Sequence, residues 1–321
     1  MERILIIGAN GQIGSELVSA LAQQHGAANV IASDIGADNL YGAARYARLD
    51  VLDKDALARL VEQEGVTQVY QLAALLSATG EKAPLKAWTL NMDGLLNILE
   101  IARERVEAGK PLKVFWPSSI AAFGPNTPGD APQYAVMDPT SIYGISKLAG
   151  ERLCEYYHAK YGVDVRSIRY PGIISFKSPP GGGTTDYAIA IFHAALKGET
   201  YECFLGPDTT LPMIYMPDAI RATIQLMDAP GEQVKIRSSY NVAGVSFNPR
   251  ELAGAIKAKL PAFEIAYKPD SRQQIADSWP KSLDDERARQ DWGWQSRVGV
   301  DEMVADMLAN VQVSVDAAVQ A

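Results

Sequence analysis

Short apolar runs alternate with longer segments of helical periodicity along the first half of the chain. The apolar runs are RILIIG (3–8), NVIASD (29–34), VTQVYQLAA (66–74), LKVFWPSS (112–119) and DVRSIRYPG (164–172). Helical spacing of hydrophobic residues is found over 11–25, 53–64, 87–107 and 141–161. Buried parallel strands have continuous apolar sequences, and parallel strands need a crossover connection that is usually helical. The alternation therefore predicts an α/β fold with a doubly wound parallel sheet.

A glycine-rich turn follows the first predicted strand. In ILIIGANGQIGSEL, Gly8, Gly11 and Gly14 surround Gln12 and Ile13 at the start of the first predicted helix. Glycine allows the backbone to approach a pyrophosphate closely, and a helix N-terminus supplies free N–H groups and a positive dipole end. The first gap is one residue longer than in the usual dinucleotide fingerprint, and a tight strand–helix turn would also use glycine. In this context the pattern predicts a dinucleotide site.

Residues at the ends of the next strands extend the predicted cofactor site. Asp34 ends the second apolar run about 20 residues after the last glycine, where a carboxylate binds ribose hydroxyls and repels a 2′-phosphate. Asp34 therefore favours NAD over NADP, and a helix or turn cap is its alternative role. Asp50 and Val51 follow at a third strand end, where an adenine could be held. The fourth apolar run passes the cofactor with Leu72, Ala73 and Ala74.

The alternation becomes irregular after about residue 172. Loops rich in proline and glycine separate shorter elements, and helices are predicted over 216–230 and 248–260. We expect an NAD-binding Rossmann domain over 1–172, to which some later elements return. Residues 173–321 are expected to form mainly a smaller, substrate-binding lobe. The final segment, 311–321, is expected to fray.

Composition limits the classes of function. The 321 residues are 47% hydrophobic and 21% charged with a net charge of −8, which predicts a soluble globular protein and argues against nucleic acid as a partner. Cys154 and Cys203 are expected to be buried free thiols, and the three scattered histidines form no metal-ligand pattern. We find no membrane-spanning run and no signal-peptide pattern, so we expect a cytoplasmic protein without a membrane partner or a metal.

Three side chains predict the chemistry. Tyr143 and Lys147 are four residues apart in TSIYGISKLAGERL, so they share one face of the predicted helix. A tyrosine with a pKa of about 10 is a poor base at neutral pH, but a nearby ammonium lowers that pKa. Ser118 and Ser119 end the fifth apolar run, where a serine hydroxyl can hold the reacting oxygen beside the tyrosine. Chance pairing and capping are the alternatives, but the order of these residues behind the glycine loop favours a catalytic set.

Together these features resemble the extended short-chain dehydrogenase/reductases, the superfamily that includes UDP-glucose 4-epimerase. The marker residues are Gly8, Gly11, Gly14, Asp34, Asp50, Asn91, Ser119, Tyr143 and Lys147. GANGQIGSEL, LAALLSATGE, PSSIAAFGP, YGISK, RYPGIIS and GGGTTDYA further resemble the epimerase-like L-threonine 3-dehydrogenases. The resemblance covers residues 1 to about 310. It implies NAD-dependent oxidation of L-threonine at its 3-hydroxyl to 2-amino-3-oxobutyrate.

The resemblance also implies roles for individual residues. Tyr143 would take the proton from the threonine hydroxyl, and Ser119 would hydrogen-bond the oxygen. Lys147 would lower the Tyr143 pKa and hold the nicotinamide ribose, whereas Asn91 would be structural. The remaining implied residues are Tyr170, Pro171 and Ile173 beside the nicotinamide, and Ser77 and Trp279 in the substrate pocket. A homodimer formed by the helices at 87–107 and 141–161 is expected by family analogy.

The resemblance suggests that the stretch PPGGGTTDYA (179–188) is a lid over the substrate pocket. Its glycines could hinge a lid that closes over a small substrate and excludes water. Thr184, Thr185 and the loop N–H groups could bind a carboxylate, while Asp186 could complement the ammonium or fix the loop. A mobile surface turn is the alternative.

Two other functions fit parts of the pattern. A nucleotide-sugar epimerase or dehydratase would use the same cofactor and catalytic residues, but its diphosphate would need basic side chains. Only Lys177 and Lys197 occur between 172 and 220, although Arg237, Arg250 and Arg272 leave this alternative open. A non-catalytic NAD(H)-sensing protein is the second alternative, and such a protein has no need of the complete serine, tyrosine and lysine set.

Overall fold

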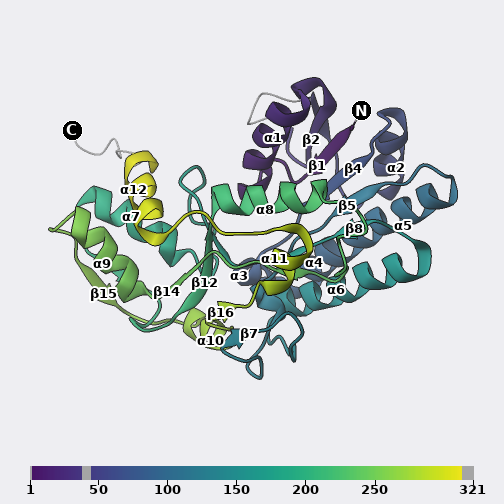
Figure 1. Ribbon diagram of the computed structural model, residues 1–321. Coiled ribbons are helices and arrows are strands. Elements are labelled where there is room, and N and C mark those ends of the chain that lie inside the picture. The colour runs from purple at the N-terminus through teal and green to yellow at the C-terminus, as the bar shows by residue number, and fades with distance from the viewer. Residues whose placement is uncertain (1, 38–44, 313–321) are drawn as a thin grey trace.

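The computed structural model describes residues 2–37 and 45–312. Most of the segment expected to fray, residues 313–321, lies outside the described residues. Figure 1 shows a larger α/β part that carries the N-terminus and a smaller part that carries the last helix.

Six parallel strands form the central sheet, in the order β3-β2-β1-β4-β5-β8. Their bounds are β1 (Ile4–Ile7), β2 (Val30–Asp34), β3 (Arg45–Arg48), β4 (Gln68–Gln71), β5 (Lys113–Phe115) and β8 (Val165–Arg166). Beyond β5 and β8 the chain continues into a second parallel set, β6 (Ser118–Ser119), β9 (Ile168–Tyr170) and β13 (Tyr240–Asn241). The predicted fold class is confirmed.

Helices cover both faces of this sheet because side chains alternate between the faces along each strand. Ile4 and Ile6 belong to a hydrophobic core shared with α1 (Gln12–His25) and α8 (Met216–Asp228). Leu5 and Ile7 belong to a second core, shared with α2 (Lys54–Gln63), α5 (Gly94–Glu107) and α6 (Ile142–Tyr161). The helix α8 therefore packs on the sheet although it comes late in the chain.

The smaller part has its own hydrophobic core, which includes Phe192, Met213 and Leu252. A three-stranded sheet, β10-β12-β14, and the pair β11-β15 lie among three helices, on the left of Figure 1. The bounds are β10 (Gly172–Ile174), β11 (Tyr201–Cys203), β12 (Leu211–Tyr215), β14 (Val245–Phe247), β15 (Ile265–Tyr267), α7 (Tyr187–Lys197), α9 (Pro249–Lys259) and α12 (Val300–Asn310).

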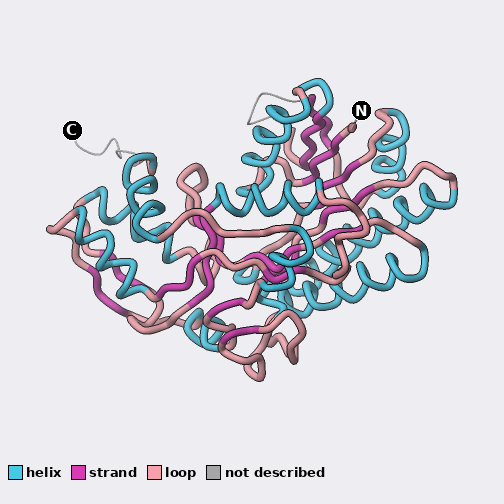
Figure 2. The backbone as a smooth tube through the Cα atoms, in the orientation of Figure 1, coloured by secondary structure: helices cyan, strands magenta, loops and turns pink. Residues whose placement is uncertain are grey.

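Short elements and loops complete the structure, and Figure 2 shows how much loop surrounds β7 and β16. These elements are α3 (Ser77–Lys82), α4 (Pro84–Trp88), a π-helical turn (Thr89–Asp93), 3₁₀ turns (Ala27–Asn29 and Ile120–Ala122), the pair β7 (Asp130–Ala131) and β16 (Ser282–Leu283), α10 (Arg272–Asp277) and α11 (Glu286–Trp292). None of the helices in residues 2–37 and 45–312 has the length and apolar character needed to cross a membrane. Cys154 and Cys203 are buried and form no disulfide, as predicted.

Candidate functional site

The glycine turn between β1 and α1 is a crowded backbone crossing. Gly8 has φ +81°, and a Cβ there would lie 2.7 Å from the backbone nitrogen of Ala73. A Cβ at Gly14 would lie 2.3 Å from the carbonyl oxygen of Gly8. The N-cap of α1 is Gly11, which offers no side-chain acceptor to the first-turn N–H groups. Those groups have no carbonyl partner within the helix, so they suit an anion such as a pyrophosphate.

A cavity of about 260 Å³ opens beside this turn. Eight of the predicted cofactor residues line this cavity. They are Gly11 at the N-cap of α1 and Gly8, Asp34, Asp50, Val51, Leu72, Ala73 and Ala74 from the strand ends. The carboxylate of Asp34 accepts N–H groups from Asn10 at 3.0 Å and Gly36 at 3.4 Å. Asp34 therefore serves as a turn cap and also lines the cavity, so its two predicted roles are compatible.

A second cavity, of about 160 Å³, gathers residues from both halves of the sequence. Its lining includes Gln12, Ile13, Ser77, Ser119, Tyr143, Lys147, Tyr170, Pro171, Ile173, Thr184, Thr185, Asp186 and Trp279. Leu72 and Ala74 line both cavities. The two cavities are thus adjacent, as the two ends of a dinucleotide require. We refer to them as the adenosine-end cavity and the reaction cavity.

Several residues that line the cavities were not predicted from the sequence. They are Ile7, Ile35, Leu49 and Leu90 in the adenosine-end cavity, and Leu76, Pro117, Ile120, Gly172 and Gly183 in the reaction cavity, which the predicted Ser118 also lines. Most are neighbours of predicted residues, and an apolar side chain carries no chemical signal of its own. Of the predicted site residues, Gly14 lines neither cavity, because its role is the close packing of α1 on the turn. A more open groove of about 610 Å³ along α8 contains none of the predicted site residues.

Helix α6 begins against the turn that carries Ser119. Its N-cap, Ser141, accepts the Gly144 N–H at 3.0 Å, and Glu81 accepts the Ile142 N–H at 2.8 Å. A Cβ at Gly144 would lie 2.1 Å from the carbonyl oxygen of Ala121, so only glycine permits this approach. The glycine after Tyr143 therefore places the tyrosine beside Ser119.

Burial dominates the electrostatics of Tyr143 and Lys147. Removal from water raises the pKa of Tyr143 to about 12, and a hydrogen bond with Ser119 opposes this shift. Burial also lowers the pKa of Lys147 to about 7. The Lys147 Nζ donates to the Pro117 carbonyl at 2.6 Å and lies 5.4 Å from the Tyr143 ring centroid. The predicted lowering of the Tyr143 pKa is therefore corrected: burial and the Ser119 hydrogen bond act on this pKa, and burial gives a net rise.

The two adjacent serines have different partners. Ser118 donates to the Glu151 carboxylate at 2.6 Å, which turns it away from a catalytic role. Ser119 accepts the Ala121 N–H at 3.2 Å, which is the predicted alternative of a cap. Its hydroxyl also meets Tyr143, so capping fixes the orientation of the catalytic candidate.

The glycine loop lies on the reaction cavity. Asp186 accepts the Gly183 N–H at 2.7 Å, and Gly182 has φ +90°. Burial raises the pKa of Asp186, and the N–H groups of the three loop glycines oppose that shift. Of the two predicted roles of Asp186, the geometry therefore supports fixing the loop.

Thr184 has an unused polar atom. Its side chain is 1% exposed, and Oγ1 has no hydrogen-bond partner among the described residues. Thr185 packs against Gly172, where a Cβ would lie 2.6 Å from Thr185 Cγ2. A buried polar atom without a partner is costly unless a ligand satisfies it. Thr184 is therefore a candidate ligand contact.

Two further predicted residues have structural partners. Asn91, in the π-helical turn, accepts the Leu75 N–H at 2.9 Å and donates to the Leu75 carbonyl at 3.1 Å and to Ser146 at 3.3 Å. The Tyr170 hydroxyl is hydrogen-bonded to Thr223. Asn91 thus links the loop after β4 to α6. Within residues 2–37 and 45–312, no group of three or more His, Cys, Asp or Glu residues is arranged to hold a metal ion.

The chain is similar to known proteins over most of its length. The model of the NAD dependent epimerase/dehydratase family matches residues 4–243. The mitochondrial L-threonine 3-dehydrogenase of Bos taurus is 43% identical over 311 residues, which cover 96% of this chain and 82% of that protein.

Solved structures are similar over almost the whole chain. The holo form of a GalE-like L-threonine dehydrogenase from Cupriavidus necator is 60% identical with a TM-score of 0.93, covering 97% of this chain and 100% of that chain. A monomeric L-threonine 3-dehydrogenase from a metagenome, in its apo form, is 44% identical with a TM-score of 0.91, covering 96% of this chain and 98% of that chain.

Proposed function

The chain belongs to the NAD-dependent epimerase/dehydratase family, and from that premise we propose that it is an NAD-dependent L-threonine 3-dehydrogenase. The observation that carries the proposal is the reaction cavity. At about 160 Å³ it is smaller than the roughly 300–1,000 Å³ typical of drug-sized ligands, and it joins Ser119, Tyr143 and Lys147 to the buried, unpaired hydroxyl of Thr184. Such a cavity suits an amino acid better than a nucleotide sugar.

The residues present fit a dinucleotide. The crowded backbone at Gly8 and Gly14 would exclude any side chain, and the first turn of α1 supplies N–H groups for the pyrophosphate. Asp34 would hold the adenosine ribose, with the adenine between Asp50, Val51 and the β4 end. Tyr170, Pro171 and Ile173 would line the nicotinamide end. When bound, NAD⁺ supplies the hydride acceptor and a positively charged ring.

The chain's own residues would move the proton. Tyr143, as phenolate, accepts the proton of the threonine 3-hydroxyl at its phenol oxygen. Ser119 hydrogen-bonds the substrate oxygen while it becomes a carbonyl. Burial raises the Tyr143 pKa, so a positive charge nearby would favour the phenolate. We propose that the Lys147 ammonium, whose Nζ lies 5.4 Å from the Tyr143 ring centroid, would supply part of that charge. Lys147 would also hold the nicotinamide ribose.

The substrate would lie beneath the glycine loop. Thr184 Oγ1 and the Thr185 side chain would bind its carboxylate, while Ser77 on α3 and Trp279 shape the remaining wall. Asp186 would keep the loop in its binding conformation through the Gly183 N–H. We propose that the loop is a lid, since its glycines permit hinge motion and its closure would exclude water.

The test is the formation of NADH, followed by absorbance, when L-threonine is added to the protein and NAD⁺. UDP-galactose is the parallel substrate. The Tyr143→Phe variant is the control, because it removes the proton acceptor and keeps the ring; we expect a loss of about 10²–10⁴-fold in kcat with NAD⁺ binding retained. The proposal is supported if the wild type forms NADH from threonine and the Tyr143→Phe variant does not. Turnover of UDP-galactose instead, or equal rates for wild type and variant, contradicts it.

The alternatives are less well supported. The three arginines that left a nucleotide sugar open are engaged elsewhere: Arg237 pairs with Asp164, Arg250 with Asp208 and Arg272 with Asp270, and none of them lines the reaction cavity. A non-catalytic NAD(H) sensor would leave the unpaired Thr184 hydroxyl without a purpose.

The remaining properties are also proposals. We propose a Rossmann domain over 1–172 and a mainly substrate-binding lobe over 173–321, supported by the separate core around Phe192 and Met213. We propose a cytoplasmic location, supported by the two free cysteines, which suit a reducing compartment.

We propose a homodimer, supported by large exposed apolar side chains on α4 and α6: Leu85, Trp88, Ile145 and Tyr156.

A further inference from the structure

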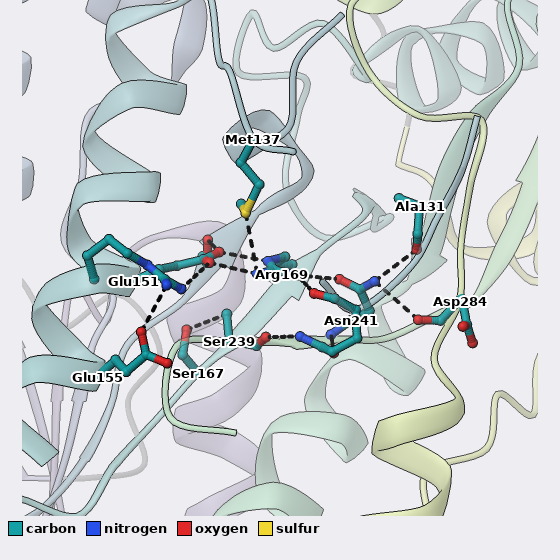
Figure 3. A network of polar contacts seen from close by, with 12 residues as sticks. Ala131, Met137, Glu151, Glu155, Ser167, Arg169, Ser239, Asn241 and Asp284 are labelled. Atoms are coloured by element: carbon teal, nitrogen blue, oxygen red, sulfur yellow. Dashed lines mark hydrogen bonds and ion pairs between the residues drawn. The ribbon is translucent and has the colours of Figure 1, made fainter. Parts of the chain in front are cut away.

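A buried ion pair lies directly behind the reaction cavity. The side chains of Glu151 and Arg169 are 0% and 2% exposed. The Arg169 Nε donates to Glu151 Oε1 and its Nη2 donates to Oε2, both at 2.8 Å. Figure 3 shows the two side chains facing each other between α6 and the strands. The contact is bidentate, which fixes its geometry as well as its charge.

This pair joins the elements that carry the catalytic residues. Glu151 lies one helical turn beyond Lys147 on α6, and its Oε1 also accepts the Ser118 hydroxyl at 2.6 Å. Arg169 is the partner of Ser118 in the β6–β9 register, and Ser119 is the partner of Tyr170. The carboxylate therefore holds α6, β6 and β9 together at one point, directly beside Ser119 and Lys147.

Arg169 extends the network into the second half of the chain. Its Nη1 donates to the Gln133 carbonyl and to Asn241 Oδ1, both at 2.9 Å. Asn241 Nδ2 in turn donates to the carbonyls of Ala131 at 3.0 Å and Asp284 at 3.1 Å, as Figure 3 shows. The guanidinium therefore ties β6 and β9 to the β7–β16 pair, of which β16 follows the cavity residue Trp279 in the chain.

Stability alone is a weak reason for such a pair. Taking two charges out of water costs free energy that the attraction between them only partly returns, and apolar residues of similar volume are often as stabilising. A role in placing the reacting groups explains the pair better, because a small misplacement of a reacting group costs a large part of the rate.

We propose that Glu151 and Arg169 are positioning residues for the dehydrogenase reaction, holding Ser119 and Lys147 in register with Tyr143. This inference rests on the proposed function. Neither residue touches the substrate, so both act through Ser118, the strand register and α6.

The charge of Glu151 adds an electrostatic part to this role. The groups around the Lys147 ammonium are Tyr143, Cys154 and Glu151 on α6, and the Trp116 ring and Pro117 carbonyl on the β5–β6 link. Burial lowers the pKa of Lys147, whereas Cys154 and the Glu151 carboxylate act in the opposite direction. Removing the carboxylate therefore lowers the pKa of Lys147 further, and the ammonium is lost at a lower pH.

The test compares Glu151→Gln with Asp164→Asn, which disrupts another bidentate arginine pair away from the site. Asp164 accepts from Arg166 at 3.0 and 2.9 Å, and Arg166 is 1% exposed. For Glu151→Gln we expect kcat with threonine to fall by about 10- to 100-fold and the basic limb of the pH–rate profile to move to lower pH. Asp164→Asn should lower Tm and keep the wild-type kcat and pH profile.

A double variant separates positioning from folding. Glu151→Leu/Arg169→Met replaces the pair by apolar side chains, so we expect its Tm to recover towards the wild-type value while kcat stays low. A double variant with wild-type kcat and pH profile, or a Glu151→Gln variant that behaves as Asp164→Asn does, overturns the proposal.

A measurement without turnover separates this proposal from the proposed function. NAD⁺ binding, followed by quenching of tryptophan fluorescence, is measured against pH in all four proteins. We expect its alkaline midpoint to move to lower pH in Glu151→Gln alone among the single variants. A Glu151→Gln variant with the wild-type midpoint overturns the positioning role. If the midpoint of Glu151→Gln moves as expected but the wild type makes no NADH from threonine, only the proposed function is contradicted.

Discussion

At the scale of single residues, burial decides what the catalytic side chains can do. Lys147 and Tyr143 are both removed from water, and both therefore favour their neutral forms: the pKa of the lysine falls to about 7 and that of the tyrosine rises to about 12. Ionisation of the tyrosine is therefore unfavourable in the folded protein without cofactor, and a cation at the nicotinamide position would favour it.

The buried lysine predicts a pH dependence of stability. Because its folded pKa is about 7 and the unfolded value is about 10.4, the unfolded chain binds more protons between these values. The free energy of unfolding should therefore rise with pH in this window, by up to about 1.4 kcal/mol per pH unit, relative to Lys147→Met. Urea unfolding of both proteins without cofactor at several pH values measures it. Parallel curves would show that the amine is not held in its neutral form.

Thr184 predicts opposite effects on stability and activity. Thr184→Val removes a hydroxyl that has no partner, so the free energy of unfolding should stay the same or increase. The lost hydrogen bond to the substrate carboxylate should cost about 1.5–3 kcal/mol, or roughly 10- to 100-fold in kcat/KM. Thr67→Val is the control, since Thr67 Oγ1 bonds Glu2 and the Arg3 backbone far from the site; it should lose stability and keep kcat/KM. A Thr184→Val enzyme with normal kinetics would refute the substrate contact.

At the scale of elements, strand ends and glycine loops form the two cavities. The parallel strands β1, β2 and β4 end at the same edge of the sheet, so Gly8, Asp34 and Ala73 meet there although they are far apart in the chain. The loop at 181–186 belongs to the smaller part, where Thr185 packs against Gly172 on β10, and Gly183 to Asp186 line the reaction cavity.

The end of β2 predicts the cofactor preference. Asp34→Ser removes the carboxylate that would bind the ribose hydroxyls and repel a 2′-phosphate, so NAD⁺ should bind more weakly and NADP⁺ relatively better. Titrations of both cofactors with wild type and variant measure the ratio of dissociation constants. Asp50→Asn, in the same cavity, should leave this ratio nearly unchanged. A wild type that already prefers NADP⁺ contradicts the assignment.

The glycine loop predicts a kinetic effect of backbone strain. Gly182→Ala places a side chain at φ +90°, which only glycine adopts easily, and should change kcat and KM for threonine together because closure is impaired. Gly109→Ala is the matched control, with φ +70° and no atom within 4 Å of the added Cβ. Both variants should lose stability, and only the first should lose activity. Equal kinetics in the two variants would favour a surface turn over a lid.

At the scale of the whole molecule, the reaction cavity exists only because the smaller part closes over the edge of the parallel sheet. Helix α8 follows β12 of the smaller part and packs in the core of the parallel sheet, so it connects the two parts. The exposed apolar residues of α4 and α6 lie on the outer surface, and residues 145 and 156 share one face of α6 because eleven residues complete about three turns.

The exposed apolar residues of α4 and α6 predict that the protein forms a homodimer. In light scattering after size exclusion, the wild type should have about twice the chain mass of 34.7 kDa, and Leu85→Glu/Ile145→Glu should have one chain mass. Val136→Glu, at another exposed apolar residue, should match the wild type. A wild type that stays monomeric at every concentration would refute the dimer.

The periodicity of the sequence determined the fold class and most of the elements. The predicted helix at 11–25 is α1 (Gln12–His25), and the one at 141–161 is α6 (Ile142–Tyr161). Two predictions were too simple. The helix at 87–107 lies over α4, a π-helical turn and α5, because Asn91 reaches Leu75. The run LKVFWPSS breaks into β5 and β6 around Pro117, which has no N–H for a sheet ladder.

Spacing and residue type also predicted most of the cavity lining, because glycine turns, strand ends and a helical i, i+4 pair are local signals. What only the tertiary structure decided is the partner of each polar group. Ser118 bonds Glu151 while Ser119 meets Tyr143, and Asp186 binds its own loop. Burial, and with it the ionisation of Lys147, depends on contacts between segments distant in sequence, so no local pattern contains it.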